Sequence, residues 1–138
     1  MYEDAKQYAA IKALEYLTPN IVLGLGSGTT ATKFVKLFAE RFQHRDTISC
    51  ICTSSEIETL ARNLNLNIID GGTFDEVDLT IDGADEATSS LELIKGGGGA
   101  LIREKIVASA SKYHITIVDE SKLHSHLGSF PLPIEIAP

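Results

Sequence analysis

The fold is decided by the stretch Ile21-Val22-Leu23-Gly24-Leu25-Gly26-Ser27-Gly28-Thr29-Thr30 and by the residues that follow it. Its first half is a short apolar run closed by glycine, which is typical of a buried strand. From Ala31 to Phe42 the apolar side chains recur at helical spacing, so a helix follows the strand directly. A strand that leads through a glycine-rich turn into a helix indicates an α/β fold.

Strands and helices continue to alternate on both sides of this stretch. Ser55 and Glu58 are spaced as a capping box at the start of one further helix. The order predicts an α/β fold, a Rossmann-like three-layer domain with a mainly parallel sheet. Ligands of such sheets bind beyond the carboxyl ends of the strands, where the most unusual segments of this chain lie. The expected strands cover residues 21–26, 48–53, 67–70, 77–82 and 114–118, and the other expected helices cover 4–17, 55–64 and 100–113.

The composition of the chain excludes several classes of protein. Its 138 residues suffice for one domain, and 43% hydrophobic with 22% charged residues is ordinary for a soluble globular protein. The net charge of −7 argues against a general nucleic-acid binder, and an anionic ligand would need local lysines and backbone amides. No apolar run approaches the ~18 residues of a membrane span, and Met1-Tyr2-Glu3-Asp4 does not open a secretory signal. We therefore expect a cytoplasmic protein whose Cys50 and Cys52 are buried, reduced thiols.

The first segment that carries chemistry is the glycine and hydroxyl loop from Gly24 to Thr30. Glycine lets successive N–H groups turn inward, and the start of the next helix adds partial positive charge, so the loop can cradle a phosphate. Gly26, Gly28 and Ala31 also fit the permissive dinucleotide fingerprint. That site needs an acid at the end of the second strand, whereas Thr53-Ser54-Ser55 stands there. A phosphate cradle is therefore favoured over a dinucleotide site and over a purely structural turn.

The second segment is the acidic turn Asp82-Gly83-Ala84-Asp85-Glu86 at the end of an expected strand. Its carboxylates repel one another, so they are expected to bind a metal, cap a helix, or contact sugar hydroxyls and move protons. The spacing does not fit a calcium loop, while Mg²⁺ stays open, and a solvated turn is the alternative without function. His124 and His126 could suggest a metal pair, but no third ligand stands at convincing spacing, so solvated loop histidines are favoured.

The third segment is Lys95-Gly96-Gly97-Gly98-Gly99-Ala100, followed by Arg103-Glu104-Lys105. Consecutive glycines cost backbone entropy, and a close approach of the chain to a ligand would explain them, with N–H groups available to an oxyanion. Lys95 would add positive charge, and Glu104 falls in the first turns of the next helix, pointing back towards the loop. A flexible linker is the alternative, but it fits poorly between two well-patterned elements.

These segments, in this order, resemble the A type of ribose-5-phosphate isomerase. The resemblance runs from Lys6 in the first expected helix to Phe130-Pro131-Leu132-Pro133, and the acidic turn is specific together with the stretch from Lys95 to Lys105. It implies interconversion of ribose 5-phosphate and ribulose 5-phosphate through an enediolate, with no metal or organic cofactor. The partner it implies is a small sugar phosphate, not a nucleic acid or a membrane.

The resemblance also implies a role for individual residues. Glu104 would be the proton acceptor, and Asp82, assisted by Asp85, would move protons between the sugar oxygens. Lys95 would stabilise the enediolate, while Lys6 and Lys122 would help to bind the phosphate. The residues implied to bind substrate are Lys6, Ser27, Gly28, Thr29, Thr30, Asp82, Gly83, Ala84, Asp85, Lys95, Gly96, Gly97, Gly98 and Lys122.

The end of the chain departs from the family pattern. Family members continue past the proline-rich stretch into a small α+β domain and then return to complete the first domain, whereas this sequence ends at Pro138. We therefore expect a catalytic domain over residues 1–129 and a strand or linker over 130–138 that would lead to that second domain. An open sheet edge invites pairing, so a homo-oligomer stays open. The alternatives to an isomerase are a non-catalytic sugar-phosphate-binding module, an inactive fragment of such an enzyme and, less favoured, a nucleotide-binding oxidoreductase domain.

Overall fold

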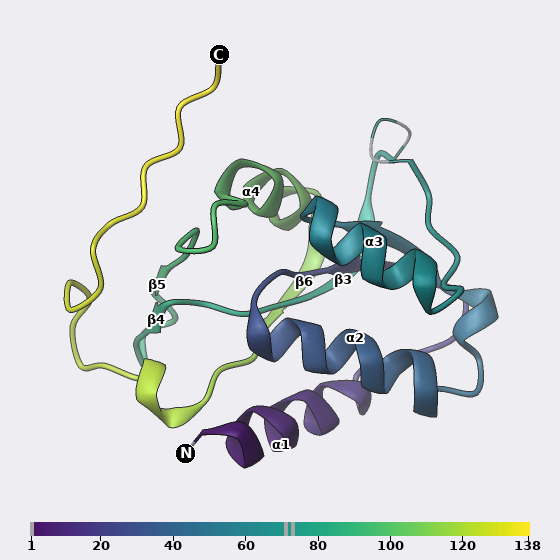
Figure 1. The fold of residues 1–138 in the computed structure, drawn as a ribbon, viewed down its shortest axis with the longest axis horizontal. Helices are drawn as coiled ribbons and strands as arrows, with labels where there is room; N and C mark the ends of the chain where they lie inside the picture. Colours follow the sequence, from purple (N-terminus) through teal and green to yellow (C-terminus); the bar gives the residue numbers. More distant parts are fainter. Residues whose placement is uncertain (1, 71, 73) are drawn as a thin grey trace.

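The computed structural model describes residues 2–70, 72 and 74–138, and Figure 1 shows how they are arranged. After Leu123 the described chain forms no helix or strand, and it runs past β4 and β5 on one side of the molecule (Figure 1). Among the helices described, none is long and apolar enough to cross a membrane. The helices are α1 (Glu3–Leu14), α2 (Thr29–Arg41), α3 (Ser55–Asn63) and α4 (Leu101–Ser109), with the 3₁₀ turns η1 (Arg45–Thr47) and η2 (Glu120–Lys122). The strands are β1 (Val22–Leu25), β2 (Ser49–Cys52), β3 (Val77–Asp82), β4 (Glu86–Ala87), β5 (Leu93–Ile94) and β6 (Ser111–Thr116).

A parallel sheet with the strand order β2-β1-β3-β6 carries the domain, which confirms the expected α/β fold. Its register places Gly24 of β1 between Ile51 of β2 and Thr80 of β3. Because all of these strands run in the same direction, their carboxyl ends meet at one edge of the sheet. A separate antiparallel ladder of β4 with β5, which the sequence pattern did not predict, lies between β3 and α4 in the chain.

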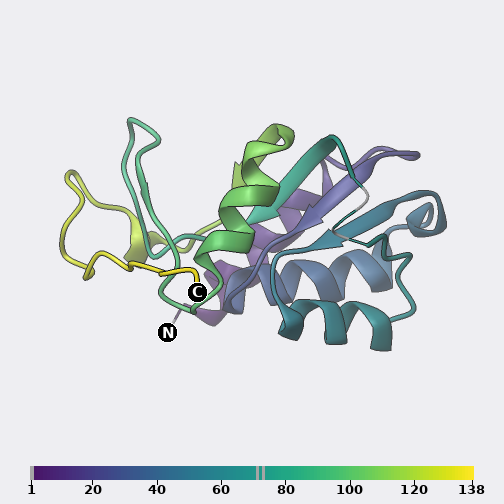
Figure 2. The ribbon, with the colours of Figure 1, turned by 90° about the horizontal axis from the view of Figure 1, so that it is seen from above.

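Helices cover both faces of the sheet, so the expected three layers are present (Figure 2). α1, α2 and α3 share the larger hydrophobic core, in which Leu23 of β1 lies with Phe34 and Phe38 of α2. These side chains are 0% exposed, and burying each of them contributes about 1.5–3 kcal/mol. α4 covers the other face, where Val107 packs with Ile51 in a smaller cluster.

The cap of α3 differs from the expected capping box by one residue. Ser54, rather than Ser55, is the N-cap, and its Oγ accepts a hydrogen bond from Ile57 N at 3.2 Å. Glu58, the expected second partner of the box, instead forms an ion pair with Arg62 at 2.7 Å along the helix. The predicted start of this helix is therefore confirmed, but the predicted capping residue, Ser55, is wrong by one position.

Several expected bounds are wrong, and at two places pairing in the sheet overrides the local pattern. The helix expected over residues 100–113 ends at Ser109, and from Ser111 the backbone already pairs with β3 as part of β6. The expected strand around Ile68 is reduced to one bridge with Cys50 beyond the edge strand β2. A short apolar segment does not form a full strand where it gains only one pairing residue.

Cys50 and Cys52 are buried in β2, as expected, and the structure has them as free cysteines. Burial raises the pKa of Cys50 to about 12 and the pKa of Cys52 to about 11. Both groups therefore stay protonated at neutral pH and act as small apolar side chains of the core.

Candidate active site

The turn between β1 and α2 forms one wall of the candidate site. Gly28 has a φ of 92°, in the left-handed region, and a Cβ at this position would meet nothing within 4 Å, so the space beside it is open. α2 begins at the next residue, and Thr32 N donates to Gly28 O. No described side chain caps this helix. The N–H groups of Thr29 and Thr30 are thereby left for a ligand, as in an anion site at a helix N-terminus.

Asp82 ends β3 next to this turn and is 0% exposed. Its Oδ1 accepts hydrogen bonds from Ser27 N at 3.0 Å and Gly83 N at 2.7 Å, and its Oδ2 lies 3.1 Å from Lys95 Nζ. The close approach of β1 requires Gly26, because a Cβ there would lie 2.2 Å from Asp82 Oδ1. The buried charge of Asp82 is thus compensated by backbone N–H groups and an ammonium.

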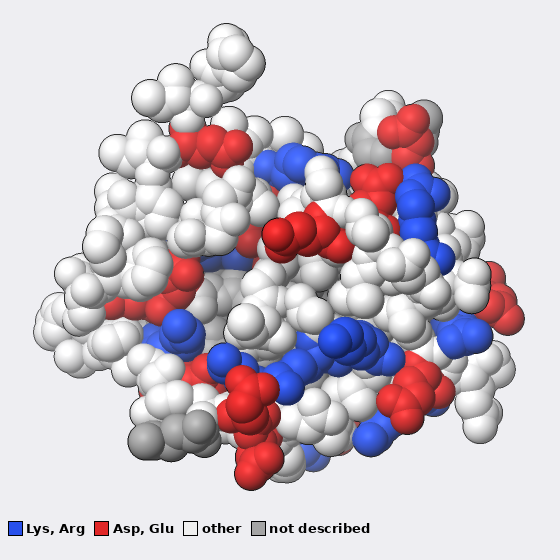
Figure 3. Space-filling view, viewed as in Figure 1, with Lys and Arg blue, Asp and Glu red and all other residues white. Residues whose placement is uncertain are grey.

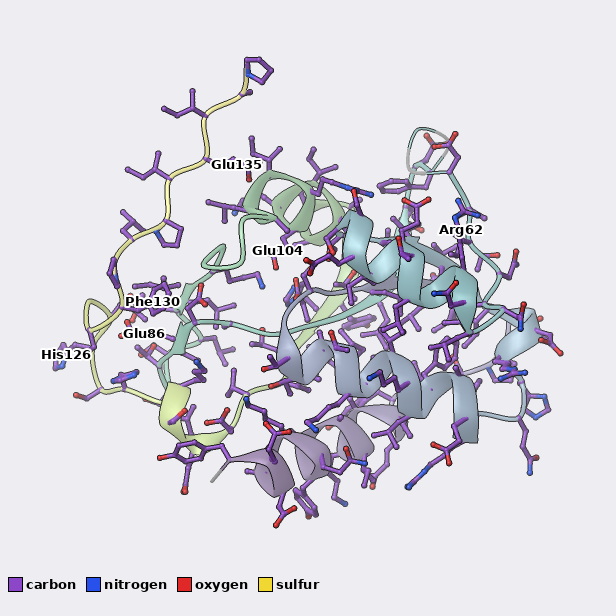
Figure 4. All side chains as sticks on the ribbon, viewed as in Figure 1. Arg62, Glu86, Glu104, His126, Phe130 and Glu135 are labelled. Atoms are coloured by element: carbon purple, nitrogen blue, oxygen red, sulfur yellow. The ribbon has the colours of Figure 1, made fainter. Side chains whose placement is uncertain are left out.

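Glu104 lies in the first turn of α4 and is 6% exposed (Figure 4). Its Oε1 is 3.7 Å from Lys95 Nζ, while Oε2 is buried without a hydrogen-bond partner among the described residues. Burial, and then the negative charge of Asp82, raise the pKa of Glu104, although Lys95 acts in the opposite direction. A carboxylate with a raised pKa and an unpaired oxygen suits a general base that takes a proton from carbon and returns it.

A cavity of about 230 Å³ joins these parts. It is lined by residues 27–30, 83–85 and 95–98, together with Ala100, Glu104 and Lys122. Every residue that the sequence predicted for the site therefore lines it, except Asp82 and Lys6. In Figure 3 a hollow lies left of the centre, and both blue and red atoms show in it. This face carries acidic and basic side chains side by side rather than a continuous basic surface (Figure 3).

The glycine run over residues 96–99 lines the cavity with its first three residues. Gly97 N donates to Asp85 Oδ2 at 2.8 Å, so this N–H group is already occupied. The N–H groups of Gly96 and Gly98 make no hydrogen bond within the described chain. Of the amides expected to stabilise an oxyanion, we therefore retain these two. Lys95, at the start of the run, also donates to the carbonyl of Gly83, which ties the run to the acidic turn.

The lysines expected to bind phosphate occupy different positions. Lys122 lines the cavity, whereas Lys6 does not, and Lys6 Nζ lies 3.5 Å from Glu3 Oε1. Both lysines act on the charge of Asp119, a residue that is 2% exposed and that the sequence pattern did not single out. Burial favours its neutral form, but hydrogen bonds from Ser121 and the charges of Lys122 and Lys6 outweigh this effect and lower its pKa. An aspartate after a strand, two residues before a serine, is a capping signal that could have identified it.

The acidic turn does not form one cluster. Asp82 contacts Lys95 and Asp85 accepts from the glycine run, but Glu86 faces another segment. Its carboxylate accepts from the backbone of residues 128 and 130, and it is 1% exposed. Within the described parts of the chain, no three His, Cys, Asp or Glu side chains are grouped as a metal site requires. The three acids thus have separate partners.

Comparisons with known proteins agree with this arrangement. A family model described as ribose 5-phosphate isomerase A (phosphoriboisomerase A) matches residues 49–138. Ribose-5-phosphate isomerase A of Bacillus mycoides (strain KBAB4) is 50% identical over 131 residues, which are 95% of this chain and 59% of that protein. The crystal structure of ribose 5 phosphate isomerase A from Neisseria gonorrhoeae has a TM-score of 0.89 and 36% identity, over 95% of this chain and 58% of that one.

A solved structure of D-ribose-5-phosphate isomerase in complex with phospho-erythronic acid has a TM-score of 0.86 and 37% identity. The match covers 91% of this chain and 56% of that one. The chain therefore spans less than two thirds of the length of these relatives.

Proposed function

The chain belongs to the ribose 5-phosphate isomerase A family, and we propose that it interconverts D-ribose 5-phosphate and D-ribulose 5-phosphate through an enediolate. The observation that carries this proposal is Glu104, a buried carboxylate with a raised pKa that lines the cavity beside a lysine. Residues 1–129 would carry the chemistry, and residues 130–138 would form an extended strand or linker.

Glu104 would move the proton that is bound to carbon. It removes the proton from C2 of the open-chain aldose, and the released electron pair forms the C1–C2 double bond while the carbonyl electrons move to O1. The same carboxyl group then returns the proton to C1, and C2 becomes the carbonyl carbon of the ketose. The raised pKa of Glu104 supports both steps, because one group must take and give back the proton at the same pH.

Lys95 and the unoccupied amides of Gly96 and Gly98 would stabilise the enediolate. The distance of 3.7 Å between Lys95 Nζ and Glu104 Oε1 supports this role, because negative charge that develops beside the base then meets an ammonium. Asp82, assisted by Asp85, would move the proton between O2 and O1. Since Asp82 lies outside the cavity lining and 3.1 Å from Lys95 Nζ, its effect on the sugar oxygens would act through that ammonium.

The phosphate of the substrate would bind between the turn at the start of α2 and Lys122. The turn offers the first N–H groups of the helix and the hydroxyls of Ser27, Thr29 and Thr30, all of which line the cavity. Local donors of this kind are needed because the chain as a whole has a net charge of −7.

The test compares the wild-type chain with Glu104→Gln for formation of ribulose 5-phosphate from ribose 5-phosphate. We expect the substitution to lower kcat by about 10²–10⁴-fold, the contribution of a general base, with affinity for phospho-erythronic acid close to the wild-type value. That acid combines a phosphate with a carboxylate, whose paired oxygens mimic an enediolate. Glu40→Gln is the control, because Glu40 is an exposed carboxylate near the far end of α2.

Two results would contradict parts of the proposal. Equal rates for wild type and Glu104→Gln would exclude Glu104 as the base. A folded wild-type chain that binds phospho-erythronic acid but forms no ribulose 5-phosphate would instead identify a non-catalytic sugar-phosphate-binding module.

A further inference from the structure

Glu86 is a buried carboxylate that the proposed reaction does not use. Its Oε2 accepts from Gly128 N at 2.8 Å and its Oε1 from Phe130 N at 2.7 Å, and His124 Nε2 lies 3.7 Å from Oε1. The hydrogen bond from Gly128 N lowers the pKa of Glu86, whereas burial raises it. The hydrogen bond from Phe130 N and the charge of His124 lower it further. Glu86 is therefore an anion at neutral pH, and its hydrogen bonds hold the turn at residues 128–130 in place.

The turn at residues 128–130 places the ring of Phe130 against Gly97 of the glycine run. A Cβ built on Gly97 would lie 2.8 Å from Phe130 Cζ and 2.7 Å from Asp85 Oδ1, so the ring and the carboxylate lie directly against this glycine. Gly97 is enclosed by the ring and by the carboxylate that accepts its N–H group at 2.8 Å. Figure 4 shows Glu86 and Phe130 next to each other beside β4 and β5. The place of Gly97 thus depends on where Phe130 is held.

The backbone of Glu86 pairs with the strand that leads to Lys95. Glu86 pairs with Ile94 in the ladder of β4 with β5, and Lys95 follows Ile94 directly. Asp85 N donates to Ile94 O at 2.7 Å, which adds a second connection between the same segments. Glu86 therefore links the strand that leads to Lys95 with the ring that contacts Gly97.

We propose that Glu86 is a positioning residue, which sets where Gly96 and Gly98 present their N–H groups by holding Phe130 against Gly97. Glu86 does not line the cavity. The inference rests on the proposed function, because the place of these N–H groups matters for a charge that develops on the sugar. A displacement of about 1 Å caused by a change away from the chemistry can cost about 10²-fold in rate.

The test uses two variants that disturb this connection in different ways. Glu86→Gln keeps the size of the side chain but replaces one acceptor oxygen by an amide that faces backbone N–H groups. Phe130→Leu keeps the backbone bonds to Glu86 and removes the ring from Gly97. We expect both variants to lower kcat by about ten- to hundredfold, with KM near the wild-type value. Glu92→Gln is the matched control, because it removes an exposed negative charge from the loop between β4 and β5 while the amide oxygen can still accept from Thr88 Oγ1.

Amide hydrogen exchange at Gly97 and Gly99, whose N–H groups donate to Asp85 Oδ2 and to Gly96 O, separates this inference from the proposed function. We expect exchange there to become faster in both variants and to stay unchanged in Glu92→Gln, whether or not the chain turns over ribose 5-phosphate. A wild-type chain without turnover would refute the proposed function, and exchange would then decide the positioning role alone. If Glu86→Gln does not fold, Phe130→Leu decides it. The inference would be overturned if amide exchange and kcat in both variants equalled those of Glu92→Gln. It would also be overturned if amides lost protection evenly over the sheet while kcat per folded molecule stayed unchanged.

Discussion

Lys95→Met removes the ammonium that lies between Asp82 and Glu104. Lys95 Nζ is 3.1 Å from Asp82 Oδ2 and 3.7 Å from Glu104 Oε1, and the lysine side chain is 16% exposed. Two unit charges at about 4 Å interact by about 4 kcal/mol at an effective dielectric constant of about 20. Methionine is unbranched and flexible like the stem of lysine, so the lost charge is the main change.

The lost charge has two expected effects on the reaction. The enediolate loses a cationic donor, and removing one such donor costs about 10²–10³-fold in kcat. Glu104 loses the charge that opposed the rise of its pKa, so this pKa moves further upward. Because the base acts in its ionised form, the acid limb of the profile of kcat/KM against pH must then move to higher pH.

The assay follows kcat/KM for ribose 5-phosphate across the acid limb in wild type, Lys95→Met and Lys105→Met. Lys105 is an exposed lysine on the same helix as Glu104, so its replacement controls for the loss of one positive charge from the chain. An acid limb that stays in place, or moves to lower pH, would refute the electrostatic coupling of Lys95 to Glu104. The loss of kcat would then report on the enediolate alone.

Two further predictions concern the phosphate and the packing of the site. Lys122→Met should weaken binding of inorganic phosphate by about tenfold or more, as expected for a lost hydrogen bond to a charged group, and Lys6→Met should weaken it less because Lys6 does not line the cavity. Calorimetric titration checks this order, and an equal or larger effect of Lys6→Met would contradict it. Gly26→Ala should destabilise the fold by about 1–3 kcal/mol and lower kcat, because its Cβ would lie 2.4 Å from Asp82 Cα. Urea unfolding measures the loss against Gly98→Ala, whose Cβ would meet nothing within 4 Å, and equal midpoints for the two variants would contradict the close approach.

The main strands could be predicted because their apolar residues are local in the sequence, and the parallel sheet followed from their alternation with helices. The ladder of β4 with β5 could not be predicted, because strands of 2 residues each show no periodicity. The end of α4 was placed too late because Ser111 pairs with Val77, a residue distant in the sequence. A local pattern indicates which residues are buried, but pairing with a distant strand decides where an element ends.

The lining of the cavity could be predicted for a geometric reason. The glycine loop follows β1, the acidic turn follows β3, and the carboxyl ends of neighbouring parallel strands lie together. The direction of each side chain in the acidic turn could not, because Glu86 is oriented by Gly128 and Phe130, which arrive from the other end of the chain. Asp119 is a different case, because its partners Ser121 and Lys122 are close in the sequence and its capping signal could have identified it.

Asp82, Asp85, Glu86 and Glu104 have different partners, and this difference supports Glu104 as the base independently of family resemblance. Asp82 accepts from two backbone N–H groups and contacts Lys95, Asp85 accepts from the glycine run, and Glu86 accepts from the turn at residues 128–130. For Glu86 these donors lower the pKa of the carboxyl group and make it a weaker base. Glu104 accepts no backbone N–H bond within the described chain, and its buried Oε2 is unpaired. Because burial then favours protonation, Glu104 is the acid of this group that is best suited to take up a proton and release it again.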